Sequence, residues 1–340
     1  MAWERIRGHD AARDQLHTAY TRGRLAHAYL FVGPSGVGKR LFATEFAKAL
    51  LCDRPPATLA ACDACPSCAQ VAAETHPDFF TVRTPEDKHE LPVGEVREFC
   101  GKLGLKPARG PRKVGVVIDA DEFNEESANC FLKTLEEPPP GSVLILLATS
   151  AERQLPTILS RSQVVRFRPL SDEELRTVLA DHGVTDPTCA GRLVRLSGGS
   201  PGQALALNDD ALWAFRETLV NGVTAAKPDP VGFAAAWMKF VEEAGKESAA
   251  QRERASLVIR LLMDVLRSAL RLAVGVGNGA EPGEAAKLRL LAERSGPDHL
   301  AELLEACAEA DYQIDRKVQL VLVIESLVDK LCRTPSRPTE

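Results

Sequence analysis

Five short apolar runs alternate with segments of helical spacing in the first half of the chain. After the first run, Phe42, Phe46 and Leu50 recur on one face of a predicted helix. Alternating strands and helices with nearly continuous apolar strands are typical of a parallel sheet covered on both faces. The pattern therefore predicts an α/β fold whose strands occupy residues 28–32, 79–82, 114–119, 143–148 and 163–167.

The strand pattern stops after Pro169. Residues 171–207 predict two or three short helices around a Ser/Gly/Pro-rich turn, and the chain reads as helical from about residue 209 onward. Predicted helices at 256–274 and 318–331 carry apolar stripes. The segment 333–340, with two prolines, is predicted to be a disordered tail. An all-α region therefore follows the α/β region.

Length and composition limit the kinds of function that this chain can have. The 340 residues allow two or three domains, and the formal net charge of −5 with 5% aromatic residues disfavours a general nucleic-acid-binding surface. No apolar run reaches membrane-spanning length and no signal-peptide core is present, so we expect a cytoplasmic protein without a membrane partner. The nine cysteines are then expected to be thiols or metal ligands rather than disulfides.

A glycine-rich loop lies between the first predicted strand and the following helix. It reads G-x-x-x-x-G-K, with Gly33, Gly36, Gly38 and Lys39. The glycines let backbone N–H groups converge on phosphate oxygens, and the lysine would reach the outer phosphates. The next position needs a hydroxyl to ligate Mg²⁺, but it is Arg40, which has no acceptor atom. The loop is therefore a degenerate phosphate-binding loop, and the sequence leaves open whether ATP or ADP occupies it.

Four cysteines predict a metal site. Cys62, Cys65 and Cys68 have C-x-x-C-x-x-C spacing, and Cys52 lies ten residues upstream. Tetrahedral Zn²⁺ takes four thiolates of this kind, and a site with four protein ligands has no open position for catalysis. We therefore predict a structural zinc, with a redox pair as the alternative for any single C-x-x-C.

A basic segment precedes the third predicted strand. Its five cationic residues lie within residues 102–113, with no acid among them: Lys102, Lys106, Arg109, Arg112 and Lys113. Such a segment is either a solvated loop or a local contact for DNA phosphates.

Several motifs together resemble one family. Residues 25–31 run into the glycine loop, residues 129–139 read N-C-F-L-K-T-L-E-E-P-P, and residues 155–162 read L-P-T-I-L-S-R-S. With the cysteine quartet, they resemble bacterial clamp-loader AAA+ subunits, in particular the delta-prime subunits of DNA polymerase III. The resemblance is dense over residues 5–205 and thin beyond them.

The resemblance implies an architecture and partners. It implies a RecA-like AAA+ domain at 1–168 with a zinc module at about 52–68, a helical lid at 169–207 and a helical collar at 208–332. It also implies a hetero-pentamer with gamma/tau and delta subunits, which loads the sliding clamp onto primed DNA in replication.

Three departures from the family pattern predict that this chain does not hydrolyse ATP. Arg40 replaces the metal-ligating hydroxyl. The family's Asp-Glu pair falls on Ile118 and Asp119, or on Asp119 and Ala120 if the register shifts by one, so one acid is lost in either case. Gln203 stands where the lid motif has an arginine. Each missing group would stabilise charge in the transition state of phosphoryl transfer.

Arg161 lies where the family places a trans-acting arginine finger, and Ser162 follows it in place of the usual cysteine. The resemblance therefore implies that Arg161 completes the ATP site of a neighbouring subunit, while the plain alternative is a surface arginine. Two other functions remain open: an active gamma/tau-like ATPase, and a zinc-dependent DNA-binding module.

Overall fold

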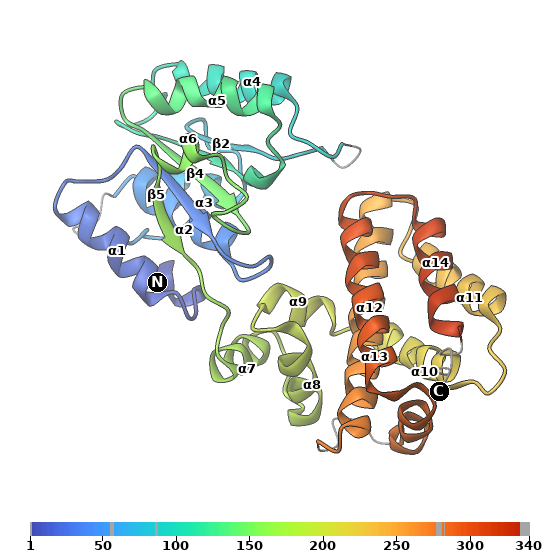
Figure 1. Cartoon of the computed structure of the whole chain (residues 1–340). Coiled ribbons are helices and arrows are strands. Elements are labelled where there is room, and N and C mark those ends of the chain that lie inside the picture. The colour runs from blue at the N-terminus through green and yellow to red at the C-terminus, as the bar shows by residue number, and fades with distance from the viewer. Residues whose placement is uncertain (1, 55–57, 86–87, 277–280, 282, 334–340) are drawn as a thin grey trace. The chain divides into compact units, whose positions relative to one another are not determined.

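The computed structural model describes residues 2–54, 58–85, 88–276, 281 and 283–333. The chain forms two compact units, Met1–Leu205 and Ala206–Glu340 (Figure 1). The predicted disordered tail lies almost entirely outside the described residues. No helix in the described part of the chain has the length and apolar character to cross a membrane.

The first unit contains a five-stranded parallel sheet in the order β2-β3-β4-β1-β5. Central strand β1 pairs with β4 and β5, which places Leu30 opposite Leu146 on one side and Val164 on the other. The predicted α/β class with a RecA-like AAA+ parallel sheet is confirmed. The strands are β1 (Ala28–Val32), β2 (Phe79–Val82), β3 (Lys113–Val117), β4 (Ser142–Ala148) and β5 (Gln163–Arg166).

Helices cover both faces of this sheet. Phe31 faces a core formed with helix α2 (Lys39–Leu51), whereas Leu30 faces a second core formed with α4 (Val93–Gly104) and α5 (Glu125–Glu136). Figure 1 shows α4 and α5 side by side. Successive side chains of a strand point to opposite faces, so burial on both faces explains the apolar runs without alternation. The remaining elements before β5 are η1 (Ala2–Arg5), α1 (Asp10–Thr21), α3 (Pro66–Ala72), η2 (Ala120–Glu122) and α6 (Pro156–Leu159).

Three short helices follow β5: α7 (Asp172–Asp181), α8 (Pro187–Ser197) and α9 (Pro201–Ala206). They agree with the two or three helices expected there. The boundary between the two units falls at residues 205 and 206, close to the end of the predicted lid. The further division of the first unit into an AAA+ domain and a lid stays a prediction.

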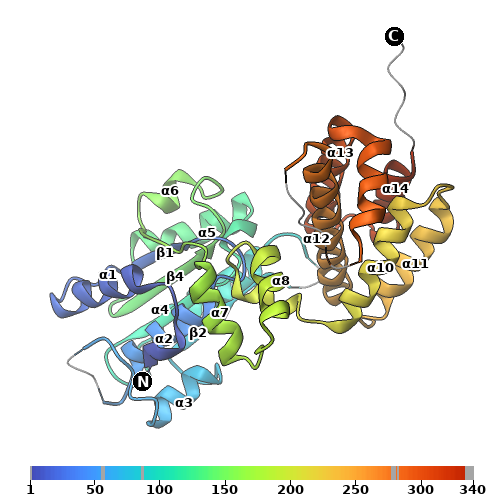
Figure 2. The ribbon, with the colours of Figure 1, turned by 90° about the horizontal axis from the view of Figure 1, so that it is seen from below.

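The second unit is helical throughout its described residues. It comprises α10 (Asp210–Thr224), α11 (Pro230–Glu242), α12 (Ser248–Ala273), α13 (Ala285–Asp315) and α14 (Leu320–Cys332). Figure 2 shows α12 and α13 packed along each other. Helix α12 begins at Ser248, earlier than the Ser256 start predicted from its apolar stripe. Helix α13 is kinked at Gly296, which has a non-helical φ of 69° and precedes Pro297.

Candidate functional sites

The glycine loop has the backbone that its motif predicts. β1 ends at Val32, α2 begins at Lys39, and Gly36 and Gly38 between them have φ of 74° and 104°. These left-handed conformations favour glycine. A Cβ at Gly36 would also lie 2.5 Å from the Ser200 hydroxyl oxygen, so the turn before α9, within the predicted lid, packs directly against the loop.

Lys39 folds back onto its own loop. Its ammonium donates to the carbonyls of Gly33 and Pro34, the latter at 2.8 Å. Burial lowers the pKa of Lys39, and the charge of Asp121 partly opposes that shift. The side chain that would bind outer phosphates is therefore bonded to backbone oxygens.

The lid satisfies two more carbonyls of the loop. The Ser200 hydroxyl donates to the Ser35 carbonyl at 2.9 Å, and the Gly202 N–H donates to the Gly36 carbonyl, also at 2.9 Å. A Cβ at Gly202 would lie 3.0 Å from the Cα of Gly36. This close approach requires the small residues of the lid turn.

His9 forms a hydrogen bond with the carbonyl of Val37 in the loop. Its buried ring places Nε2 2.8 Å from the Val37 carbonyl, so Nε2 carries the donating hydrogen. The ring contacts the edge of Phe167, and burial lowers the pKa of His9. Together with the lysine and lid bonds, every carbonyl from residue 33 to residue 37 accepts a hydrogen bond from within the chain.

Arg40, at the metal-ligand position, forms an ion pair. Its Nη2 lies 2.6 Å from Oε1 of Glu74, just beyond α3. Glu74 also accepts a hydrogen bond from the Thr81 hydroxyl at 3.2 Å. The Arg40 hydrogen bond lowers the pKa of Glu74 and keeps the carboxylate ionised. The residue that cannot hold Mg²⁺ therefore links α2 to the segment between α3 and β2.

Two of the acids after β3 accept hydrogen bonds from other segments of the chain. Asp119 accepts from the Thr84 N–H at 3.2 Å, and burial raises its pKa. Asp121 accepts from the Thr149 N–H at 2.6 Å and from Gln154 Nε2 at 2.8 Å. Ile118, at the metal-shell position in the ungapped register, packs against the core. The register of the acids stays a prediction.

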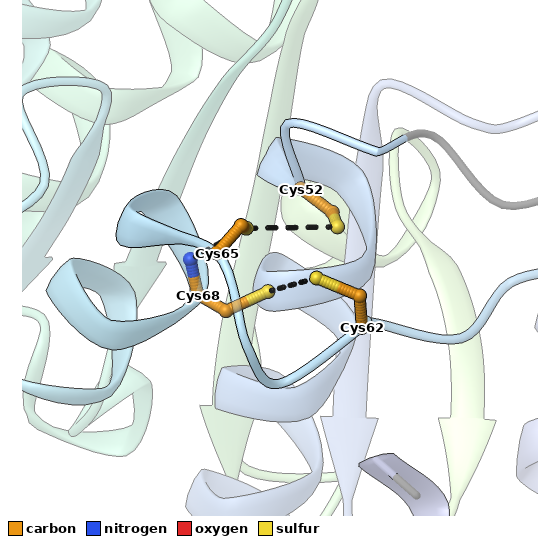
Figure 3. A group of neighbouring side chains, drawn as sticks. All are labelled: Cys52, Cys62, Cys65 and Cys68. Carbon is orange, nitrogen blue, oxygen red and sulfur yellow. Dashed lines mark hydrogen bonds between the residues drawn. The ribbon is translucent and has the colours of Figure 1, made fainter.

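The structure brings the four predicted cysteines together (Figure 3). Their sulfurs all lie within 4.8 Å of one another, with 3.8 Å between Cys52 and Cys65 and 4.0 Å between Cys62 and Cys68. Sulfurs at tetrahedral corners about 2.3 Å from Zn²⁺ would be about 3.8 Å apart. A disulfide needs only about 2.05 Å. The quartet fits a tetrahedral metal better than disulfides.

Local backbone geometry explains the convergence of the sulfurs. Cys52 follows the last turn of α2, Cys65 caps α3 by accepting from the Cys68 N–H at 3.4 Å, and Asp63 adopts a left-handed φ of 54°. Backbone hydrogen bonding, chiefly from Ala64, lowers the pKa of Cys62 to about 6, whereas burial raises the pKa of Cys68. Metal binding would have to displace the Cys68 proton.

Polar groups outside the predicted ligand set support this cysteine loop. Lys48 of α2 is buried, pairs with Glu45 at 2.9 Å and also pairs with Asp63. On the other side, the Ser67 hydroxyl donates to Asp53 at 2.6 Å, and His76 Nε2 lies 3.2 Å from the same hydroxyl oxygen. Asp53, Asp63 and Ser67 lie next to the cysteines in sequence, but their bonding to one another and to Lys48 and His76 depends on the fold and has no sequence signal.

Arg161 lies at the surface immediately beyond α6. Its Nη2 donates to Glu136 Oε1 at 2.8 Å, and its Nη1 donates to the Thr157 carbonyl at 3.3 Å and the Ser160 hydroxyl at 3.2 Å. About a third of the side chain, 36%, is exposed. The guanidinium is thus held by the chain yet accessible from outside.

Several basic residues of segment 102–113 are engaged within the chain. Lys113 is buried and donates to the Lys102 carbonyl at 2.7 Å, while Lys102 pairs with Glu98. The Arg109 guanidinium donates to Gln70 Oε1 at 3.0 Å, and the Arg109 backbone N–H donates to the buried Asp78 carboxylate at 2.6 Å. These contacts favour a structural role, and contact with DNA stays a prediction.

Comparison with known proteins identifies the family. The family model described as DNA polymerase III, delta subunit, matches residues 8–171. The DNA polymerase III subunit delta' of Escherichia coli is 32% identical over 291 residues, covering 86% of this chain and 84% of the relative. The chain belongs to the delta-prime family of DNA polymerase III subunits. The predicted resemblance is therefore confirmed.

Other members and relatives match less of their own length. The delta-prime subunit of Pseudomonas aeruginosa is 40% identical over 208 residues, which span 59% of this chain and 62% of that protein. The gamma/tau subunit of Mycobacterium tuberculosis is 32% identical over 63% of this chain but only 38% of its own length. The delta-prime family is thus related in sequence to gamma/tau subunits.

Proposed function

We propose that this chain is a delta-prime clamp-loader subunit that does not hydrolyse ATP and that supplies Arg161 in trans to a neighbouring ATPase subunit. The observation that carries the non-hydrolysing part is the state of the glycine loop. The loop keeps its strand–loop–helix geometry, but its metal-ligand position is an arginine paired with Glu74.

The contacts of the loop support this proposal. A nucleotide site needs a free lysine, a metal ligand and room beside the loop for phosphates. Here Lys39 is bonded to the loop itself, and the lid turn contacts the loop through Ser200 and Gly202. The loop therefore also works as a packing element that joins the sheet to the turn before α9, and phosphate binding through Lys39 would require its ammonium to leave the carbonyls of Gly33 and Pro34.

The surface position of Arg161 supports a role in trans. A trans-acting arginine stabilises charge on a transferring phosphoryl group and contributes roughly 10³–10⁵ in rate in known systems. It must be reachable by a neighbour and must not be buried in its own subunit. Arg161 meets both conditions, because its guanidinium is anchored at one edge and partly exposed.

The cysteine quartet fits a structural zinc held by Cys52, Cys62, Cys65 and Cys68. When bound, the metal would supply folding energy and no open coordination position. The ion pair between Lys48 of α2 and Asp63 joins the cysteine loop to the helix that follows the glycine loop, which supports this proposal. The metal would therefore stabilise the first unit.

The proposed partners follow from the family. We infer that the helical residues 208–332 form the collar that joins gamma/tau and delta subunits in a hetero-pentamer. The assembled complex would load the sliding clamp onto primed DNA during replication in the cytoplasm. The active gamma/tau-like alternative predicts ATP turnover by the isolated chain, and the DNA-binding alternative predicts DNA affinity without partner subunits.

The test is an ATPase assay of the chain alone and of the complex with gamma/tau and delta subunits. We expect no turnover from the chain alone, stimulation in the complex, and loss of about 10²-fold or more of that stimulation with Arg161→Ala. Arg153→Ala, at another exposed arginine of the same unit, is the control and should leave stimulation unchanged. Turnover by the isolated chain would support the gamma/tau-like alternative instead.

A further inference from the structure

Arg161 is paired with an acid from a different segment of the fold. Glu136 is the last residue of α5, and its Oε1 accepts from Nη2 of Arg161 at 2.8 Å across 25 positions of sequence. Both side chains are partly exposed, 36% for the arginine and 50% for the glutamate. The pair therefore joins the end of α5 to the end of α6 at the surface.

Glu136 occupies a position where the end of its helix destabilises a carboxylate. Carboxylates are disfavoured near the C-terminus of a helix, where the helix dipole is negative. The helix ends firmly just beyond it, because Pro138 and Pro139 cannot continue it. Its start is fixed by a capping box between Asn124 and Ser127. Glu136 is therefore a fixed acceptor on a rigid element, and a nearby cation offsets its unfavourable site.

The contacts fix the plane of the guanidinium. Nη1 donates to the Thr157 carbonyl and the Ser160 hydroxyl, while Nη2 donates to Glu136. Arginine has five N–H donors in a planar fork. Within the described residues, the Nε–H and one Nη2–H have no acceptor, so two donors of the guanidinium are left to bind a phosphate.

We propose that Glu136 is a positioning residue that sets the orientation of Arg161 toward a phosphate held by a neighbouring subunit. This inference rests on the proposed trans role of Arg161. Without Glu136, the guanidinium would keep only the acceptors on Nη1 and could rotate about that edge. Because transition-state stabilisation depends on donor placement, a displacement of about 1 Å can cost on the order of 10²-fold in rate.

The test compares variants in the full complex with gamma/tau and delta subunits. We expect Glu136→Gln to lower the stimulated kcat about 10-fold while leaving KM for ATP unchanged. Glu136→Asp, which keeps the charge on a shorter side chain, should fall between the parent and Glu136→Gln. Glu98→Gln removes another exposed ion pair, with Lys102, and should have no effect. An exposed pair contributes little to folding, so thermal denaturation should be nearly unchanged in all three variants.

The double variant separates positioning from other effects. If Glu136 acts through Arg161, Glu136→Gln should have no further effect in an Arg161→Ala background. Full or raised stimulation with Glu136→Gln, or an equal loss in both backgrounds, would overturn the positioning role while the proposed function stands. If Arg161→Ala itself leaves stimulation intact, the proposed function fails.

Discussion

The guanidinium of Arg40 and the carboxylate of Glu74 lie 2.6 Å apart, from Nη2 to Oε1. This ion pair joins the start of α2 to the segment just after α3. A metal-ligating hydroxyl at this position would instead face the phosphates of a nucleotide. The departure from the phosphate-loop pattern is thus accompanied by a specific partner in the fold.

We expect that Arg40→Ser will not create an ATPase. The hydroxyl returns, but Gln203 still stands where the family's lid motif has an arginine, and Lys39 remains bonded to the carbonyls of Gly33 and Pro34. Because the Arg40 pair is about half exposed, its loss should cost only about 0–1 kcal/mol of stability. An assay of Mg²⁺-dependent phosphate release checks the absence of ATPase activity, and thermal denaturation checks the small loss of stability. Mg²⁺-dependent turnover by this variant would show that Arg40 alone silences the site.

Gly36→Ala should loosen the contact between the glycine loop and the lid. The new Cβ would lie 2.5 Å from the Ser200 hydroxyl oxygen at a φ of 74°, so both a clash and backbone strain oppose it. We expect a loss of about 1–3 kcal/mol and faster hydrogen exchange in α9. Gly101→Ala, in the interior of α4 with open space around its Cβ, is the control and should be neutral or stabilising.

Local patterns predicted the positions of the strands and the glycine loop well, because each depends on residues close in sequence. The five predicted apolar runs coincide with β1 to β5 to within two residues at each end. The pairing of Arg40 with Glu74 spans 34 positions and has no local signal. The short helix α3 was not among the predicted elements, because its seven residues are too few to show a periodic apolar pattern, although Pro66 is favourable at its first position.

Cys65→Ser should abolish tight zinc binding and destabilise the first unit. It removes one of four converging sulfurs, and metal binding free energy at such sites contributes to folding. We expect less than one equivalent of zinc by elemental analysis and a fall in melting temperature of about 5–15 °C, taking ~2–4 °C per kcal/mol. Cys100→Ser, at a cysteine outside the quartet, should keep its zinc. A metal-free parent with unchanged stability would contradict the zinc assignment.

The ion pair between Arg168 and Glu174 should make the free energy of unfolding depend on pH in the acidic range. Hydrogen bonds from Arg168 first, and then from the Ser171 N–H, lower the pKa of Glu174 from 4.5 to about 2. Because the folded pKa is the lower one, this stabilisation is fully present above pH 4.5 and is lost as the pH falls toward 2.

Glu174→Gln should therefore flatten the loss of stability between about pH 5 and pH 2, as measured by urea midpoints across that range. The carboxylate is partly exposed, so the effect is expected to be modest. Glu173→Gln, at the neighbouring position of the same helix turn, is the control. If the two variants have the same pH profile, the Arg168 pair does not carry the dependence.

Arg216 is a buried charge that links three elements of the second unit. Its side chain is 3% exposed, forms an ion pair with Asp264 at 2.9 Å and donates to Glu284 at 2.8 Å, which joins α10 and α12 to the residue before α13. Removing one partner of a buried ionic group leaves the others unpaired, so Arg216→Ala should cost about 3–5 kcal/mol. Hydrogen exchange in α10 and α12 assigns the loss to this unit.

A matched set of variants tests the cause of that loss. Arg271→Ala, at an exposed arginine of α12, should change stability by no more than ~0.5 kcal/mol. Replacing all three charges, as Arg216→Met with Asp264→Leu and Glu284→Leu, should recover much of the stability, because no buried carboxylate is then left unpaired. If the triple variant is as unstable as Arg216→Ala, lost packing of the arginine stem rather than unpaired charge accounts for the effect.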